Sequence, residues 1–196
     1  MDIDYKSLLW AIAVIIGMIS YIPYIRDMFA WKTKPHVFSW FLRWFWSLIL
    51  FIGKWDGGAW AWARANLRVA VICLFTTLYG LFHGSKKYIT VSDYIVGALA
   101  LLAFVLYFLT DGRFRPIFLI NITDTLSLVP SIRKSRYDPR TETTSMYFMS
   151  GIKFCVMIFA TAEYSFITLS NNVLRIILNF GFALFLSIRR RQLHNV

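Results

Sequence analysis

The sequence predicts an all-α membrane protein with seven transmembrane helices, arranged as two parallel three-helix repeats joined by a linker helix (3+1+3). Three observations predict it. Hydrophobic residues make up 58% of the chain, they form long continuous stretches, and related segments recur in its two halves at a constant offset. The mean hydropathy of +0.58 and the charged fraction of 16% lie outside the usual range of soluble domains.

Seven spans account for most of the 196 residues. A hydrocarbon core of about 30 Å takes about 20 apolar residues per helical crossing. Charged and turn-forming breaks delimit expected spans at 7–27, 36–53, 61–82, 92–110, 114–132, 143–161 and 168–188. Little remains for loops, which excludes a separate soluble catalytic domain. The first stretch follows acidic residues rather than the positive start of a signal peptide, so we expect it to stay as a helix.

The basic residues indicate the orientation, because positively charged loops stay in the cytoplasm. Most of the 21 Lys and Arg residues fall on one side: Arg26, Lys32, Lys34, Lys86, Lys87, Arg133, Lys134, Arg136, Arg140, Arg189, Arg190 and Arg191. We expect the N-terminus outside and the C-terminus in the cytoplasm, and the short loops favour a prokaryotic inner (plasma) membrane. These loops explain the net charge of +11, so contact with membrane lipid is expected and nucleic-acid binding is not.

The internal repeat relates the two halves of the chain. Ser20–Arg26 and Ser127–Arg133 share the pattern Ser-x-x-Pro-x-Ile-Arg, and the offset between them recurs along the rest of the two halves. Each repeat is three helices, so one extra crossing must separate two repeats of parallel orientation. The expected domains are a first repeat at 1–85, a linker-helix region at 86–111, and a second repeat with a short basic C-terminus at 112–196. In such proteins the substrate path lies on the axis between the halves.

Two proline-bearing segments and the topology together resemble the PQ-loop superfamily, which includes the SWEET sugar transporters and the lysosomal cystine transporter. The segments are Tyr21–Asp27 with Pro35, and Val129–Arg133 with Pro139. The family's Pro-Gln dipeptide is absent, since Tyr24 and Ser131 follow the first prolines. The resemblance implies a seven-helix fold with the N-terminus outside.

Proline inside a helix removes a backbone donor and produces a kink. The resemblance implies that Pro23, Pro35, Pro130 and Pro139 act as hinges that let each three-helix bundle rock. We favour the hinge interpretation for Pro23 and Pro130. For Pro35 and Pro139 the start of a helix, where proline is well tolerated, is an equally good interpretation.

Charged groups at membrane depth cost a few kcal/mol on insertion scales and mark candidate sites. Asp124 and Lys153 each lie about ten residues into their spans, near ~15 Å of depth at the usual helical rise, so we expect them to meet. Asn121, one turn before Asp124, and Asn179 add neutral polar groups. Two interpretations stay open: a permanent pair that fixes helix register, or a bridge that opens on protonation or substrate binding. The resemblance implies proton coupling through an aspartate on the fifth helix.

The corresponding positions of the first repeat are apolar and aromatic. Trp40, Trp44 and Trp46 are expected to form the opposite wall of a pocket for a small polar solute with a flat or sugar-like face. Plain helix packing is the competing interpretation. The resemblance also implies binding asparagines on the third and seventh helices, which map to Asn66 and Asn179.

The sequence therefore predicts a small-solute transporter working by alternating access, for a sugar, an amino acid or a vitamin-like metabolite, with proton coupling left open. The alternative is a non-transporting membrane receptor or scaffold on the same fold. No enzyme activity, cofactor or metal is expected. The three histidines, His36, His83 and His194, look isolated at the cytoplasmic edge. Expected partners are the substrate and lipid, and a homo-oligomer stays open.

Overall fold

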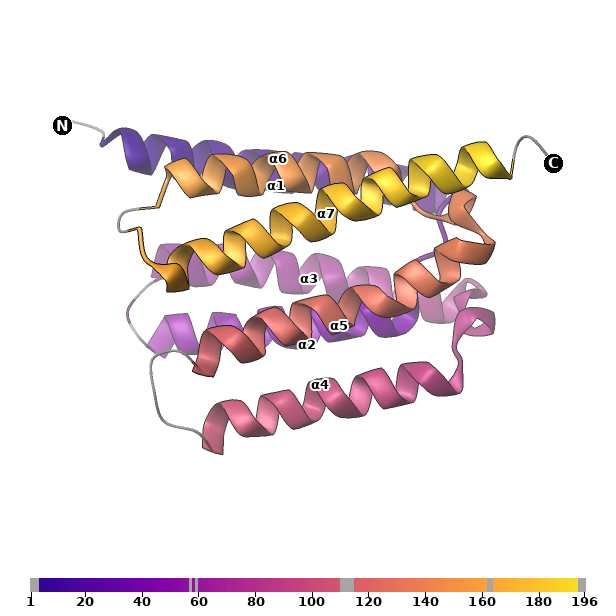
Figure 1. The fold of residues 1–196 in the computed structure, drawn as a ribbon, viewed down its shortest axis with the longest axis horizontal. Coiled ribbons are helices and arrows are strands. Elements are labelled where there is room, and N and C mark those ends of the chain that lie inside the picture. Colours follow the sequence, from indigo (N-terminus) through magenta and orange to yellow (C-terminus); the bar gives the residue numbers. More distant parts are fainter. Residues whose placement is uncertain (1–3, 57, 59, 110–114, 162–163, 194–196) are drawn as a thin grey trace. The chain divides into compact units, whose positions relative to one another are not determined.

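The computed structural model describes residues 4–56, 58, 60–109, 115–161 and 164–193 (Figure 1). These residues form seven α-helices and two short 3₁₀ helices, with no strand among them. The all-helical prediction is confirmed for this part of the chain. Three stretches, Tyr5–Phe29, Ala63–Phe82 and Thr168–Gln192, are long and apolar enough to cross a membrane.

The helix bounds follow the expected spans closely. They are α1 (Tyr5–Phe29), α2 (Val37–Asp56), α3 (Trp60–Phe82), η1 (Ser85–Tyr88), α4 (Val91–Leu109), α5 (Arg115–Tyr137), η2 (Pro139–Thr141), α6 (Thr144–Phe159) and α7 (Phe166–Gln192). The largest differences are at the ends of α5 and α7, expected at 132 and 188. Both helices continue through a basic last turn, because cations there stabilise the negative end of the helix dipole.

The helices form two compact units. Unit 1 consists of Met1–Thr33 and Asp138–Val196, and unit 2 consists of Lys34–Tyr137. In unit 1, α6 packs against both α1 and α7. In unit 2, α2 packs against α3 and α5, and α4 packs against α5. A small apolar core of Leu42, Val96 and Ala100, with Leu126 packed on it, joins α2, α4 and α5.

The units group the helices differently from the expected domains at 1–85, 86–111 and 112–196. The repeat offset, which carries Pro23 onto Pro130, pairs α1 with α5, α2 with α6, and α3 with α7. Each unit therefore contains the first helix of one expected repeat and the second and third helices of the other. Within both units the first helix packs on the second, and the second on the third. The repeat is inferred from the sequence and stays a prediction. In the structure, α1 packs with the second and third helices of the second expected repeat, and α5 with those of the first.

The two internal prolines lie within continuous helices, Pro23 in α1 and Pro130 in α5. Three residues before each proline, a serine hydroxyl donates to a backbone carbonyl three residues earlier: Ser20 to Gly17 and Ser127 to Asp124, both at 2.7 Å. Such back-bonding bends helices, as does the missing proline N–H. The same serine contact therefore precedes the proline at corresponding places in the two units.

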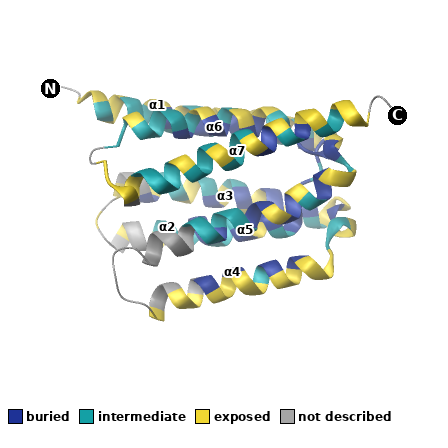
Figure 2. Ribbon diagram, viewed as in Figure 1, coloured by how far each residue is buried: buried dark blue, intermediate teal, exposed yellow. Residues whose placement is uncertain are grey.

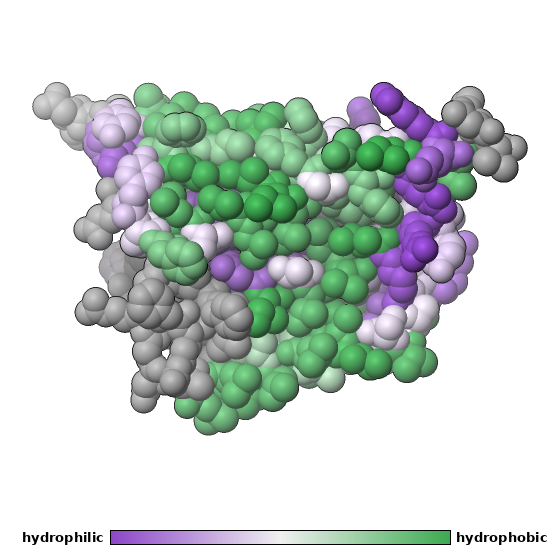
Figure 3. All heavy atoms as spheres, viewed as in Figure 1, coloured by the Kyte–Doolittle hydropathy of each residue, from purple (hydrophilic) through white to green (hydrophobic). Residues whose placement is uncertain are grey.

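Large apolar side chains face outward along whole helices. On α1 the exposed series is Leu8, Ile12, Ile15, Ile19 and Ile22, whereas the buried face carries Ala13, Gly17, Ser20, Tyr24 and Met28. Figure 2 shows α4 exposed along much of its length, and hydrophilic residues gather at the C-terminal ends of α5 and α7 (Figure 3). Small or polar residues inside and large apolar residues outside are typical of helices that pack within lipid.

Glycines permit the closest helix contacts in unit 1. A Cβ atom at Gly151 of α6 would lie 2.6 Å from the Phe180 ring of α7, and one at Gly17 of α1 would lie 2.7 Å from Cδ of Lys153. Gly181 of α7 faces open space. Two glycines are therefore needed for packing and the third is not.

We expect Gly151→Ala to lower the free energy of unfolding by about 1–3 kcal/mol, because the Phe180 ring must move to relieve overpacking. The matched control Gly181→Ala should be neutral or stabilise by up to about 1 kcal/mol, since alanine is the better helix former. Thermal unfolding in detergent measures both. Equal melting temperatures for the two variants would contradict this account of α6–α7 packing.

Candidate functional site

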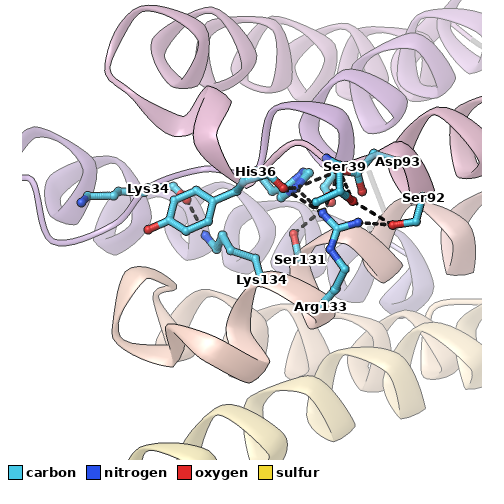
Figure 4. Close-up of polar contacts among 10 residues, drawn as sticks. Lys34, His36, Ser39, Ser92, Asp93, Ser131, Arg133 and Lys134 are labelled. Atoms are coloured by element: carbon cyan, nitrogen blue, oxygen red, sulfur yellow. Dashed lines mark hydrogen bonds and ion pairs between the residues drawn. The ribbon is translucent and has the colours of Figure 1, made fainter.

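A buried ion cluster ties together three helix ends of unit 2 (Figure 4). The Arg133 Nη2 atom of α5 lies 2.7 Å from Asp93 Oδ2 of α4 and 2.8 Å from the Tyr88 carbonyl oxygen, and Nη1 donates to the Ser92 hydroxyl. His36, directly before α2, has its Nε2 atom 3.1 Å from the Tyr88 carbonyl oxygen and 3.6 Å from Asp93 Oδ2. We call His36, Ser92, Asp93 and Arg133 the His36 cluster.

Local sequence positions the carboxylate of this cluster. Asp93 is the third residue of α4, and its Oδ2 atom accepts the backbone N–H of Thr90 at 2.8 Å, while the Asp93 N–H donates to the Thr90 carbonyl at 2.9 Å. This pattern satisfies donors at the start of a helix. Arg133 follows Pro130 by three residues, so the last turns of α5 carry the guanidinium to the start of α4. Asp93 therefore caps one helix and binds the end of another.

His36 and Asp93 are removed from solvent, whereas Ser92 and Arg133 lie on the solvent side of the cluster. The side chains of His36 and Asp93 are 0% and 1% exposed, and that of Arg133 is 27% exposed. A buried carboxylate is tolerated only with a charged or hydrogen-bonding partner, which Arg133 provides. Burial lowers the pKa of the His36 imidazole, and the Arg133 and Lys134 cations lower it further, whereas Asp93 and the Tyr88 carbonyl act in the opposite direction. His36 is therefore neutral near pH 7.

Lys134 adds a further link between segments of unit 2. Its Nζ atom donates to the Lys34 carbonyl and lies 5.5 Å from the centroid of the Tyr88 ring. The neighbouring Ser131 hydroxyl donates to the Ser39 hydroxyl of α2 at 3.0 Å. The end of α5 is thus bonded to α4, to η1 and to the segment that leads into α2.

Unit 1 has its own buried carboxylate at the corresponding helix ends. Glu142 precedes α6, is 1% exposed, and accepts hydrogen bonds from the hydroxyls of Tyr24 in α1 at 3.4 Å and Tyr147 in α6 at 3.2 Å. Arg190 of α7 donates to the carbonyls of Glu142 and Pro139. We call these residues the Glu142 cluster; it joins α1, α6 and α7.

The polar residues expected at membrane depth fall on both units. Asn121 and Asp124 lie on α5 of unit 2 and are half-buried. In unit 1, the Lys153 side chain lies against Gly17, and its Nζ atom is 4.1 Å from the centroid of the Phe154 ring. Asp124 and Lys153 belong to different units, so their expected meeting stays a prediction.

Unit 1 brings a second cation to the same aromatic ring. The guanidinium carbon of Arg175 in α7 lies 5.1 Å from the Phe154 centroid. The amide nitrogen of Asn179, expected to bind substrate, donates to the Arg175 carbonyl at 2.8 Å. Cation–π contacts of this kind lower the cost of cations at membrane depth. Lys153, Phe154 and Arg175 therefore form a local group that spacing alone does not predict.

The expected tryptophan wall lies on α2 of unit 2. Trp40 and Trp46 are buried, and the Arg43 guanidinium carbon lies 5.3 Å from the Trp40 ring centroid. Trp44 is half-buried beside Phe41, at a centroid separation of 5.5 Å. These contacts are compatible with packing, and a substrate-facing role stays a prediction. Asn66, on α3, is half-buried.

Pro35 and Pro139 lie outside the long helices. Pro35 is buried in the segment that precedes α2, and Pro139 is the buried first residue of η2. The chain passes between the units at Thr33–Lys34 and at Tyr137–Asp138. Each proline therefore follows one of these two passages within two residues.

The isolation expected for His36 is wrong, because Asp93 and Arg133 lie beside it. The pattern Thr90-x-x-Asp93 signals a helix start, but nothing in the spacing reveals that this carboxylate also meets Arg133, 40 residues away. His83 is exposed and contacts the carbonyl of Tyr79 in its own helix, and His194 lies outside the described residues. Among the described residues no group of three His, Cys, Asp or Glu could hold a metal ion.

Comparisons with protein-family models, with curated proteins and with solved structures find no match to this chain. The resemblance to the PQ-loop superfamily therefore rests on the proline segments and the expected topology.

The lowered pKa of His36 predicts a pH dependence of stability. The unfolded chain binds a proton at His36 more readily than the fold does, so stability falls as the pH drops below about 6.5, the ordinary pKa of histidine, and through the lowered pKa of His36. His36→Gln should make the melting temperature less pH-dependent in this window. His83→Gln, which changes an exposed histidine, should behave as wild type, and a matching loss of pH dependence in that control would contradict the assignment.

Proposed function

We propose that this protein is an integral membrane transporter that moves a small polar solute, such as a sugar, an amino acid or a vitamin-like metabolite, by alternating access. The observation that best supports the proposal is the division into two compact units, each containing one proline-bearing helix and joined by only two passages of the chain. Two bodies with few covalent connections are what a rocking mechanism requires.

The membrane setting is supported by the outward-facing apolar side chains of α1 and α4 and by three helices of spanning length. In the proposed orientation the N-terminus is outside and the basic end of α7 is in the cytoplasm of a prokaryotic cell. The His36 cluster and the Glu142 cluster then both lie at cytoplasmic helix ends. Each cluster would hold the helices of its unit together while the units move.

The moving parts follow from the same arrangement. Buried clusters fix helix ends within a unit, so motion concentrates at the two passages, next to Pro35 and Pro139, and at the bends around Pro23 and Pro130. Asp124, Asn121, Lys153 and Asn179 supply polar groups for the solute. Asp124 is also the proposed proton-coupling residue, because it is a carboxylate in the middle of an expected membrane span.

Uptake and efflux by the protein in reconstituted vesicles test this function. A panel of labelled sugars, amino acids and vitamin-like compounds should include at least one with flux above empty vesicles. Saturable binding of a panel member without flux would instead support the receptor alternative, and neither flux nor binding across the panel would count against the proposal.

Pro23→Ala and Pro130→Ala should leave the protein folded and slow solute exchange. Each restores a helical hydrogen bond worth about 1 kcal/mol, which corresponds to roughly fivefold slower exchange if the bend must change in the transition state. Ile22→Ala and Val129→Ala, at exposed neighbouring positions, are the controls. Normal exchange rates in both proline variants would remove the hinge role of these residues.

Asp124→Asn should keep the melting temperature while abolishing net or pH-dependent flux, because the amide keeps size and hydrogen bonding but cannot exchange a proton. Asp4→Asn serves as the control, since asparagine caps a helix as well as aspartate does and Asp4 caps α1. Flux and thermal unfolding are measured on the same preparations. An Asp124→Asn variant with wild-type, pH-dependent flux shows that another residue carries the proton.

A further inference from the structure

One carboxylate oxygen of the His36 cluster faces two nitrogen groups that can carry positive charge. Asp93 Oδ2 lies 2.7 Å from Arg133 Nη2 and 3.6 Å from His36 Nε2. The imidazole and the carboxylate are fully buried, whereas the guanidinium is 27% exposed. Arg133 is thus the charged member of the cluster that already reaches solvent.

The neutral imidazole of His36 has one bare ring nitrogen, which can bind a proton. The Nη2 atom of Arg133 donates to Asp93 and to the Tyr88 carbonyl. His36 Nε2 lies 3.1 Å from the same carbonyl oxygen, to which it donates in one tautomer, and 3.4 Å from Arg133 Nη2, from which it accepts in the other. No described residue forms a hydrogen bond with Nδ1. His36 is a buried neutral base beside a carboxylate held by another cation.

We infer that His36 is a proton-binding site, and that its proton transfers Asp93 from Arg133 to His36 and releases the end of α5 from the start of α4. The proton comes from bulk water and binds the bare ring nitrogen, so the imidazole becomes a cation. The Asp93 carboxylate then pairs with the imidazolium through Nε2–H. Arg133 gives up its bond to Asp93 and moves to solvent, and no other proton changes place.

The surrounding charges explain why Arg133 must leave. The groups that face His36 are Asp93 from α4, Arg133 and Lys134 from α5, and the Tyr88 carbonyl from η1. Lys86, Lys87 and His83, on the neighbouring η1 and the end of α3, are exposed. Protonation would add a positive charge at His36 to those of Arg133 and Lys134, with Asp93 as the carboxylate that faces it, and like charges in a buried place repel. Lys134 is buried and bonded to the Lys34 carbonyl, so Arg133 is the cation that can withdraw.

Release of the end of α5 would allow a movement that extends along this helix to Pro130 and Asp124. In the proposed orientation the site senses cytoplasmic pH. The inference does not rest on transport, since its tests measure proton binding and a distance within unit 2. Failure of these tests leaves the transport proposal standing, and absence of flux leaves this inference standing.

Nuclear magnetic resonance of labelled histidine in the full-length protein tests proton binding directly, with the His36 signal assigned from His36→Gln. In wild type we expect His36 to titrate below about 6.5, the ordinary histidine pKa. In Arg133→Met the carboxylate is left to the imidazole and one nearby cation is removed, so the pKa of His36 should be higher than in wild type. A His36 pKa that is unchanged or lower in Arg133→Met would overturn the exchange of partners.

Asp93→Asn covers the case in which Arg133→Met does not fold. It removes the carboxylate that both cations share, so His36 should titrate still lower than in wild type. A higher His36 pKa in Asp93→Asn would overturn the inference, because the imidazolium would then not depend on Asp93.

Spin-label distances test the release of α5. Labels at Val91→Cys in α4 and Tyr137→Cys in α5, both at exposed positions, are placed after replacement of Cys73 and Cys155 by alanine. From about pH 7.5 to about pH 5, a range that spans ordinary histidine titration, a second and longer distance should appear. His36→Gln should abolish it, and His83→Gln should retain it. A distance that does not change with pH, or that changes equally in His36→Gln, overturns the inference.

Discussion

Burial of a carboxylate at the end of a helix is the constraint on which the rest of this structure depends. A buried negative charge needs several donors at once, and a single helix cannot supply them. Glu142 obtains them from α1 and α6, and Asp93 from α5 and from Thr90, directly before its own helix. Each carboxylate therefore draws helix ends from distant parts of the sequence into one unit. The helices beyond these ends need only pack through small residues such as Gly17 and Gly151, and can leave their large apolar side chains outside.

The two clusters also determine where the molecule can bend. The chain enters and leaves each unit beside them, at Thr33–Lys34 and Tyr137–Asp138. In unit 1 the hydroxyls of Thr33 and Thr143 lie 2.6 Å apart, and Thr143 donates to Asp27 at 3.0 Å. In unit 2 the Lys34 carbonyl accepts from Lys134. Both sides of the first passage are therefore bonded to their own units. Alternating access by two stiff bodies, as proposed for this protein, would use these passages.

Much of the fold follows from the sequence, because apolar length and charged breaks are local properties. Each of the seven helices corresponds to one expected span. The predicted ends of α5 and α7 come too early because the basic residues of their last turns resemble the start of a loop. The grouping of helices does not follow from it. The constant offset between the halves shows which helices correspond, whereas packing depends on contacts such as Tyr24 with Glu142, which no periodicity encodes. For the same reason the sequence spacing does not predict the partners of His36, since Asp93 and Arg133 come from two other helices. The roles expected for Asp124, Lys153 and the tryptophans stay predictions.

Paired distance measurements can show whether the two units move as stiff bodies, as the proposed transport mechanism requires. One spin-label pair joins exposed positions on different units, Leu8 of α1 and Leu67 of α3, and a control pair lies within unit 1, Leu8 and Val173 of α7. In lipid nanodiscs we expect two populations of distances for the first pair, with proportions that change when a transported solute is added. We expect one unchanged population for the control pair. A single fixed distance for the first pair in every condition, or a control pair that varies as much as the first, would contradict it.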